Sequence, residues 1–191
     1  MRFIIGIIVT LGLISLTSSE AVTLHPIVQK LQGHWESECF VPAGYVDENR
    51  NIVEITGKRL SYWIEMCPPF HSHVKTVSEI SFEIGKDYPA VQGAKIINAT
   101  IESIKITALD SSLLSQLNAY RVCGKRDWEE NETVECAGKP NGFGAKNLSK
   151  GTKGGYLIAL DVQGKFYTNL GAHSSSTPLT ELDLEHPLTK K

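Results

Sequence analysis

Two histidines separated by one residue have the spacing in this sequence that is most typical of metal binding. His71 and His73 lie on one face if their segment is extended, and imidazole nitrogens at this spacing can bind a metal ion. They follow Cys67-Pro68-Pro69, which indicates a loop, and no other histidine or carboxylate is fixed near them by the sequence. We therefore interpret both as exposed loop residues, and we predict no metal site and no cofactor.

Residues for nucleophilic or acid–base chemistry form no recognisable catalytic pattern. No serine lies in a G-x-S-x-G turn. Glu79 and Glu83 alternate with apolar residues, so they are expected to face water. If the cysteines are paired, no thiolate nucleophile remains. The sequence therefore favours a protein that is not an enzyme.

The first 21 residues resemble an export signal rather than part of a fold. Arg2 precedes an apolar run over residues 3–16, and small and polar residues follow. We expect cleavage after Ala21, or two or three residues earlier; an uncleaved anchor is the alternative. Residues 22–191 are then a single domain, secreted or periplasmic, with no membrane span. A net charge of −2 argues against nucleic acid or an anionic membrane as the main partner.

Four cysteines in an exported chain indicate two disulfides. They are Cys39, Cys67, Cys123 and Cys136. Three pairings are possible. We favour Cys39–Cys67 and Cys123–Cys136, because each of these pairs could link neighbouring strands of a meander.

Alternation of apolar and polar residues predicts strands over much of the chain. It is clear over residues 60–66 and 74–84, and Gly57-Lys58 is typical of a hairpin turn that precedes the first of these. Between residues 94 and 109 the apolar residues change from odd to even positions. This slip predicts a bulge or break near Glu102-Ser103, or else two strands with a turn around Asn98.

The second half of the chain contains one short helical pattern among further strands. Residues 110–118 predict a turn or two of helix, capped by Asp110. The other predicted elements are a strand pair at 119–123 and 133–136, a long loop at 138–155, a hairpin at 156–170 that turns at Gln163-Gly164, and an edge strand at 182–186 limited by Pro187. Eight or nine regularly spaced strands predict an antiparallel all-β sandwich or barrel.

The beginning of the mature chain resembles a known signature. Gly33-x-Trp35 on the first strand resembles the opening motif of the lipocalin and calycin families. The longer form Gly33-x-Trp35-x-Ser37-x-Cys39 resembles disulfide-containing, lipocalin-like exported proteins such as the APCDD1-type extracellular domain. The segment ending in Cys67-Pro68 and the late hairpin 164–171 agree with this resemblance.

The resemblance implies an antiparallel up-and-down β-barrel of about eight to nine strands with one short connecting helix. It implies that Gly33 allows a kink and that Trp35 plugs the closed end of the barrel. In lipocalins a late arginine stacks on this tryptophan, and Lys165 is the nearest counterpart in place.

The barrel interior would be either filled by side chains or wide enough for one small ligand. Candidate ligand-binding residues are Tyr62, Ile64, Met66, Ile80, Phe82, Tyr120 and Phe166. We expect non-catalytic binding of a small, mostly apolar ligand such as a lipid or fatty acid. The alternative is a protein–protein interaction module that uses the loops around Trp128 and 138–155, with a partner that the sequence does not identify; an enzyme is the third possibility.

Overall fold

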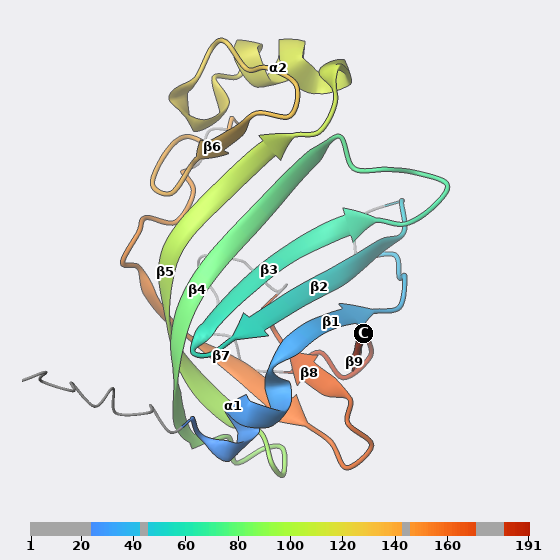
Figure 1. Ribbon diagram of the computed structural model, residues 1–191, viewed down its shortest axis with the longest axis vertical. Helices are drawn as coiled ribbons and strands as arrows, with labels where there is room; N and C mark the ends of the chain where they lie inside the picture. The colour runs from blue at the N-terminus through green and yellow to red at the C-terminus, as the bar shows by residue number, and fades with distance from the viewer. Residues whose placement is uncertain (1–23, 43–45, 143–145, 171–181) are drawn as a thin grey trace, which may run out of the picture.

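The chain folds into a closed antiparallel β-barrel of eight strands (Figure 1). The computed structural model describes residues 24–42, 46–142, 146–170 and 182–191, so the predicted signal peptide lies outside the described residues. The barrel strands are β1 (Gly33–Ser37), β2 (Asn49–Thr56), β3 (Arg59–Met66), β4 (Val74–Asp87), β5 (Lys95–Ala108), β7 (Lys153–Leu160), β8 (Phe166–Thr168) and β9 (Leu188–Lys190). Each pairs with the next, and β9 pairs with β1 to close the barrel. The predicted all-β antiparallel barrel is confirmed.

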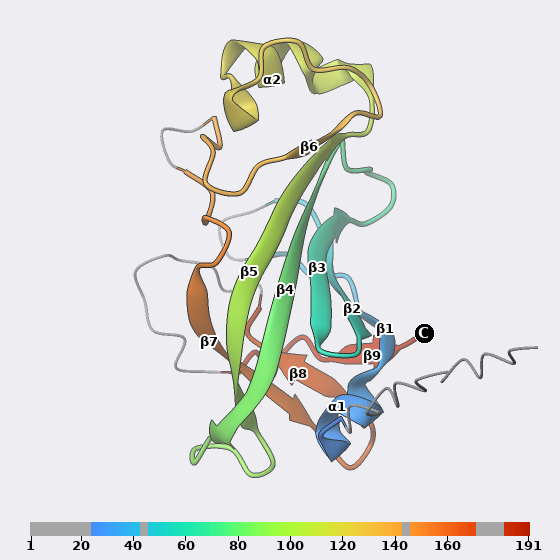
Figure 2. The same cartoon turned by 60° about the vertical axis from the view of Figure 1, so that its left-hand side comes forward.

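The two ends of the barrel differ. Helix α1 (Pro26–Leu31) and the short hairpins β2–β3, β4–β5 and β7–β8 lie at one end, here called the α1 end. The connections β1–β2, β3–β4, β5–β7 and β8–β9 lie at the other, here called the loop end. Figure 2 shows that β4 and β5 extend towards helix α2 (Leu114–Ala119), which lies beyond their loop-end termini. Strands of an up-and-down barrel alternate in direction, so every second connection falls at the same end.

Alternate residues of each strand face the barrel interior. Trp35, Val53, Tyr62 and Ser78 form one continuous row across β1 to β4. The residues two positions along each strand share that inner face. Apolar side chains fill the α1 end, where the most deeply buried include Leu31, Val53, Ile55, Leu60, Ile80, Ile97, Ile158 and Phe166. A smaller apolar cluster, which includes Leu157 and Ala159, lies on the outer face of β7.

Strand β5 is a single strand with one bulge, as one of the two sequence interpretations predicted. Ile80 pairs with Ile101 and Glu79 pairs with Ser103, so Glu102 is the extra residue. The bulge turns Ile104 and Ile106 to the same inner face as Ile101 despite their opposite parity. The slip in the apolar pattern therefore had a structural cause at the predicted place.

Residues 119–123 are not a strand, contrary to prediction. After β5 the chain forms η1 (Ser111–Leu113), α2 (Leu114–Ala119) and η2 (Val122–Gly124), which matches the predicted short helix and then extends it. Arg121 and Cys123 have left-handed backbones, with φ of 51° and 56°, which a strand does not tolerate. Strand β6 (Thr133–Glu135) forms where a strand was predicted, but it pairs with the loop-end half of β5.

Two further elements differ from the sequence interpretation. The last strand begins after Pro187 instead of ending before it, because Leu188 pairs with both Ser37 and Phe166 and is buried between them. Helix α1 was not predicted. Its signals are Pro26 at the start and the apolar pair Val28 and Leu31, which both pack into the barrel.

Both disulfides join the cysteines that the sequence analysis favoured. Cys39 is bonded to Cys67, with a sequence separation of 28, and Cys123 to Cys136, with a separation of 13. The first links the β1–β2 connection to the end of β3. The second joins Cys123 of η2, which follows α2, to Cys136, which directly follows β6. It therefore fixes the helical segment 111–124 onto the sheet.

Removing the first disulfide is expected to cost more stability than removing the second. In the chain-entropy model, loops of these lengths give about 3.5 and about 3 kcal/mol respectively, because the longer loop restricts the unfolded chain more. Denaturant unfolding of Cys39→Ala/Cys67→Ala and Cys123→Ala/Cys136→Ala measures both values. Losses below about 1 kcal/mol for either pair would contradict this expectation.

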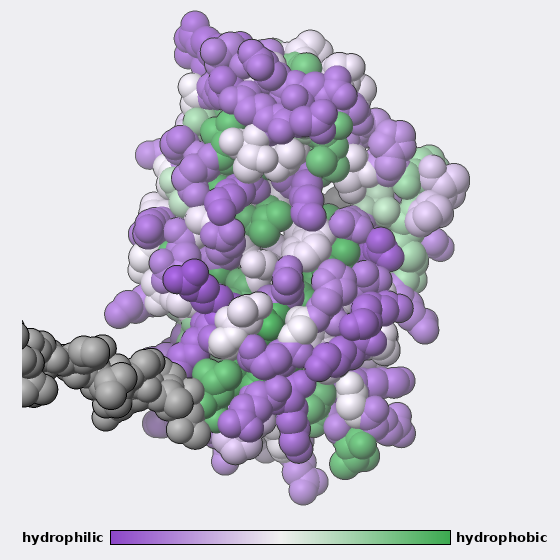
Figure 3. All heavy atoms as spheres, viewed as in Figure 1, coloured by the Kyte–Doolittle hydropathy of each residue, from purple (hydrophilic) through white to green (hydrophobic). Residues whose placement is uncertain are grey.

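The face of the molecule shown in Figure 3 is largely polar. Figure 3 shows hydrophilic side chains over most of the visible face, with hydrophobic ones in separate small groups. Glu79 follows the inward-facing Ser78 and so lies on the outside of the barrel, where it accepts hydrogen bonds from Lys105 Nζ (2.7 Å) and Ser103 Oγ (2.6 Å). Among the described residues, no helix is both long enough and apolar enough to cross a membrane.

Candidate functional site

Trp35 fills the barrel at the α1 end. Its buried indole donates a hydrogen bond from Nε1 to the carbonyl oxygen of Leu31, at 2.7 Å. Its ring meets that of Phe166 edge to face, with centroids 5.5 Å apart. The indole therefore joins α1 to Phe166 of β8, two strands from β1 around the barrel, and no ligand space is expected at this level.

The basic residue beside Trp35 is Lys190. Its Nζ lies 5.8 Å from the centroid of the indole ring, and the two residues are paired across β1 and β9. Lys165, the nearest counterpart in the sequence, lies instead in the β7–β8 turn, where its backbone N–H donates to Asp161. The predicted last strand ended before Pro187, whereas β9 begins after it. The sequence therefore did not show that Lys190 lies beside Trp35.

Gly33 has a backbone conformation that favours glycine. Its φ is +115°, and a Cβ at this position would lie 3.0 Å from Cε of Lys190. The lysine side chain can move, but the backbone strain would remain. Gly33→Ala is therefore expected to lower the free energy of unfolding by about 1–3 kcal/mol. Denaturant unfolding measures this, and a stability equal to that of the wild-type chain would show that the conformation is not required.

The predicted ligand-binding residues fall at different heights in the barrel. Ile80, Phe82 and Phe166 are at most 3 % exposed and belong to the packed core. Ile64 and Met66 lie nearer the loop end, on the inner face that Leu60 and Tyr62 also occupy. Ile64 is 44 % exposed and Met66 is half-buried. Solvent therefore reaches the inner face of β3 beyond Tyr62.

Tyr62 lies between the packed half and the accessible half of the interior. Its hydroxyl donates a hydrogen bond to Oδ1 of Asn51, at 2.9 Å. Burial, together with the charge of Asp183, raises the pKa of the Tyr62 phenol well above its ordinary value, so the hydroxyl stays neutral. It can therefore present a neutral polar group at the base of the accessible half.

The inner face combines polar and apolar residues towards the loop end, where β5 contributes Ile104, Ile106 and Ala108. Its polar residues there are Ser37, Asn49, Asn51, Thr76, Ser78 and Thr168. Thr76 is exposed, and Asn51 and Ser78 are half-buried. Over the described strands, this half of the inner face carries hydroxyl and amide groups rather than carboxylates or imidazoles. Such a surface can accept and donate hydrogen bonds without adding charge.

Exposed apolar side chains are concentrated at the loop end. Among the described residues, the exposed large apolar side chains at this end are Val41, Val46, Ile64, Phe70, Leu109, Tyr120 and Leu148, and Leu184 lies in the segment before β9. Val162, in the β7–β8 turn, is at the α1 end. The contrast places accessible apolar surface around the same end at which the inner face is accessible.

Tyr120 does not face the interior, contrary to the sequence interpretation. It ends helix α2 and is 57 % exposed. The expected strand would have pointed its ring inward, but the helix and the left-handed Arg121 that follows turn it outward. Tyr120 therefore does not line the barrel interior.

Trp128 is buried among the residues that follow β5 and belongs to the main apolar cluster. It is 3 % exposed, its Nε1 donates to the carbonyl oxygen of Val122 at 3.2 Å, and its backbone N–H donates to Oδ1 of Asn118. It packs in the same apolar cluster as Leu117 and the Cys123–Cys136 disulfide. Its indole is therefore not an exposed contact for a protein partner. Residues 143–145 of the second predicted contact loop lie outside the described part of the chain.

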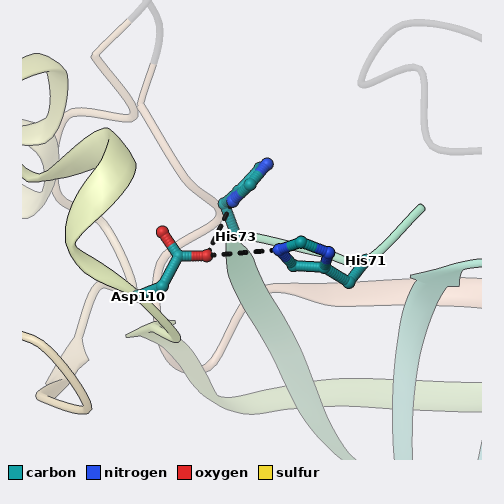
Figure 4. Close-up of side chains that lie close together, drawn as sticks. All are labelled: His71, His73 and Asp110. Carbon is teal, nitrogen blue, oxygen red and sulfur yellow. Dashed lines mark hydrogen bonds and ion pairs between the residues drawn. The ribbon is translucent and has the colours of Figure 1, made fainter.

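His71 and His73 come together with a third residue that sequence spacing did not reveal. Figure 4 shows both imidazoles directed at the carboxylate of Asp110. Oδ2 of Asp110 lies 2.6 Å from Nδ1 of His73 and 3.8 Å from Nε2 of His71. Asp110 was predicted only as a helix cap, and its side chain does accept a hydrogen bond from the Ser112 backbone N–H (2.8 Å). The pairing of β4 with β5 brings it to the histidines.

The eight-stranded antiparallel barrel with its two disulfides fits a lipocalin-like fold. Comparison with known family models and with curated proteins gives no match for this chain. A family assignment and a function for this chain are therefore proposals that rest on the residues themselves.

Proposed function

We propose that this chain is an exported, non-catalytic binding protein that holds one small, mostly apolar ligand, such as a lipid or fatty acid, in the loop-end half of its barrel. The observation that carries the proposal is the 44 % exposure of Ile64 on the inner face of β3. An apolar side chain directed into a barrel yet accessible to solvent gains stability when a ligand covers it. The two disulfides agree with an oxidising, secreted or periplasmic setting.

The distribution of polarity suggests how such a ligand would lie. Ile64, Met66 and the apolar residues of the connections can contact a hydrocarbon chain. Tyr62, Asn51, Thr76 and Ser78 can hydrogen-bond one neutral or carboxylate head group. Pockets of this composition, mostly apolar with a few convergent polar groups, are typical of small-molecule binding. Uncharged inner-face groups favour binding over acid–base catalysis.

A titration with a hydrophobic fluorescent probe tests the proposal. The purified protein is first stripped of bound lipid, and fatty acid is then used to displace the probe. The expected result is saturation at one probe per chain and displacement by fatty acid at a similar stoichiometry. Absence of probe binding by the folded, delipidated protein would refute the proposal.

Burial of Trp128 also disfavours the alternative of a protein-binding surface centred on that residue.

A further inference from the structure

We propose that His71, His73 and Asp110 form a binding site for a divalent late transition-metal ion, of which zinc is the representative, at the loop end of the barrel. One ligand atom from each residue lies within 4.8 Å of the other two, and no other group of three potential ligands is found among the described residues. The inference goes beyond the proposed function and does not depend on whether the barrel binds lipid.

The sheet holds the three residues together although 37 residues separate His73 from Asp110. Val74, the first residue of β4, pairs with Ala108, the last residue of β5. The pairing continues one step further, because the backbone N–H of Leu109 donates to the carbonyl oxygen of His73 at 2.9 Å. Asp110 therefore follows β5 directly beside the two histidines, which precede β4.

The distances suit a metal after small side-chain rotations. Two ligand atoms of a tetrahedral zinc ion with bonds near 2.05 Å lie about 3.3 Å apart. Asp110 Oδ2 is now 2.6 Å from His73 and 3.8 Å from His71, which brackets this value. The rings of the two histidines meet edge to face, with centroids 4.8 Å apart. The side chain of His71 is 76 % exposed, so it is free of packing constraints that would prevent it from closing on an ion.

Hydrogen bonds already orient the carboxylate for this role. Oδ1 of Asp110 accepts from the backbone N–H of Ser112 at 2.8 Å and from its hydroxyl, which leaves Oδ2 directed at the histidines. Such outer hydrogen bonds are typical of metal sites, because they fix the ligand before the ion arrives. Hydrogen bonds from Ser112 and then from His73 lower the pKa of Asp110 to about 2, so it is ionised at neutral pH.

The donor atoms decide which ions the site would prefer. Two imidazole nitrogens and one carboxylate oxygen suit zinc and its late first-row neighbours, whereas calcium and magnesium prefer oxygen ligands alone. Binding through Nδ1 of His73 requires its ring proton to lie on Nε2, so the present hydrogen bond to Asp110 would be exchanged for the metal bond. Three protein ligands leave one position for water.

Zinc binding is tested by isothermal titration calorimetry on the full protein purified without a polyhistidine tag. We expect one zinc ion per chain and no competition from calcium. In His71→Ala and in Asp110→Asn, the affinity for zinc should fall by about 10- to 100-fold or more. Ser112→Ala should weaken binding by about 10-fold. His34→Ala is the matched control, because His34 is also partly exposed and paired with a carboxylate, Glu36 at 2.9 Å.

Circular dichroism verifies that each variant is folded, and the exposure of His71 makes its replacement harmless to the core. Unchanged zinc affinity in His34→Ala, together with the losses above, supports the site. Failure of the wild-type protein to bind zinc, or equal losses in His34→Ala and His71→Ala, would overturn it.

Discussion

Replacing Trp35 with alanine is expected to lower the free energy of unfolding by about 3–5 kcal/mol. The indole is 2 % exposed, contacts Phe166 edge to face and donates a hydrogen bond to the Leu31 carbonyl. Its removal leaves a cavity that neither α1 nor the strand backbones can close, and it also leaves the Leu31 carbonyl without that donor. Equilibrium unfolding in urea measures the loss.

Val162→Ala is the control for this stability measurement. Val162 is fully exposed in the β7–β8 turn, so its replacement should change the free energy of unfolding by no more than about 0.5 kcal/mol. A loss below about 1 kcal/mol for Trp35→Ala would mean that the α1 end is not held closed by this side chain.

Ile64→Glu is expected to reduce the affinity for fatty acid or a hydrophobic probe by at least about 10-fold while leaving stability almost unchanged. Ile64 is already accessible to solvent, so a carboxylate is tolerated there in the absence of ligand. A bound hydrocarbon chain would strip water from that carboxylate, which costs free energy that no nearby cation is positioned to recover among the described inner-face residues of this half. Fluorescence titration of the delipidated protein gives the affinity.

The matched control is Val162→Glu, which places the same charge on an exposed aliphatic residue at the opposite end of the barrel. Its affinity should stay within about twofold of the wild-type value. If Ile64→Glu binds as tightly as Val162→Glu, the ligand does not lie against the inner face of β3.

Local patterns predicted the barrel strands well where one face is buried. Alternation around Tyr62 and Phe82 placed β3 and β4, and the change of parity after Ile101 placed the bulge of β5 at Glu102. In each case a shift of one residue in the strand pairing would turn apolar side chains to water. The apolar pattern of the sequence therefore determines the register of these strands. The favoured disulfides were also correct, although neither joins two neighbouring strands as expected: Cys39 lies in the β1–β2 connection, and Cys123 lies in η2.

The helical segment 111–124 and the last strand could not be predicted from local sequence patterns in the same way. Tyr120 and Val122 are residue types that favour strands, yet Arg121 and Cys123 adopt left-handed conformations that no local pattern reveals. Strand β9 has three residues, and only Leu188 carries an apolar signal. Its partners β1 and β8 determine it, and local sequence does not show them.

The candidate sites depended on contacts between distant residues. Tyr120 was assigned to the interior because its strand was misassigned. The meeting of Asp110 with His71 and His73 follows from the pairing of β4 with β5, which sequence spacing does not reveal. The sequence shows which residues face the interior but not how deeply each is packed. Ile64 and Phe82 were therefore predicted together as ligand-binding residues, although Ile64 is exposed and Phe82 is buried.

The most direct test of ligand binding in the barrel is an isotope-filtered nuclear Overhauser measurement between an unlabelled fatty acid and the methyl-labelled protein. Binding in the loop-end half predicts contacts from the hydrocarbon chain to the methyl groups of Ile64 and Met66, and none to Val162. Contacts confined to outer-face methyl groups, or no contacts to the protein at all, would contradict it.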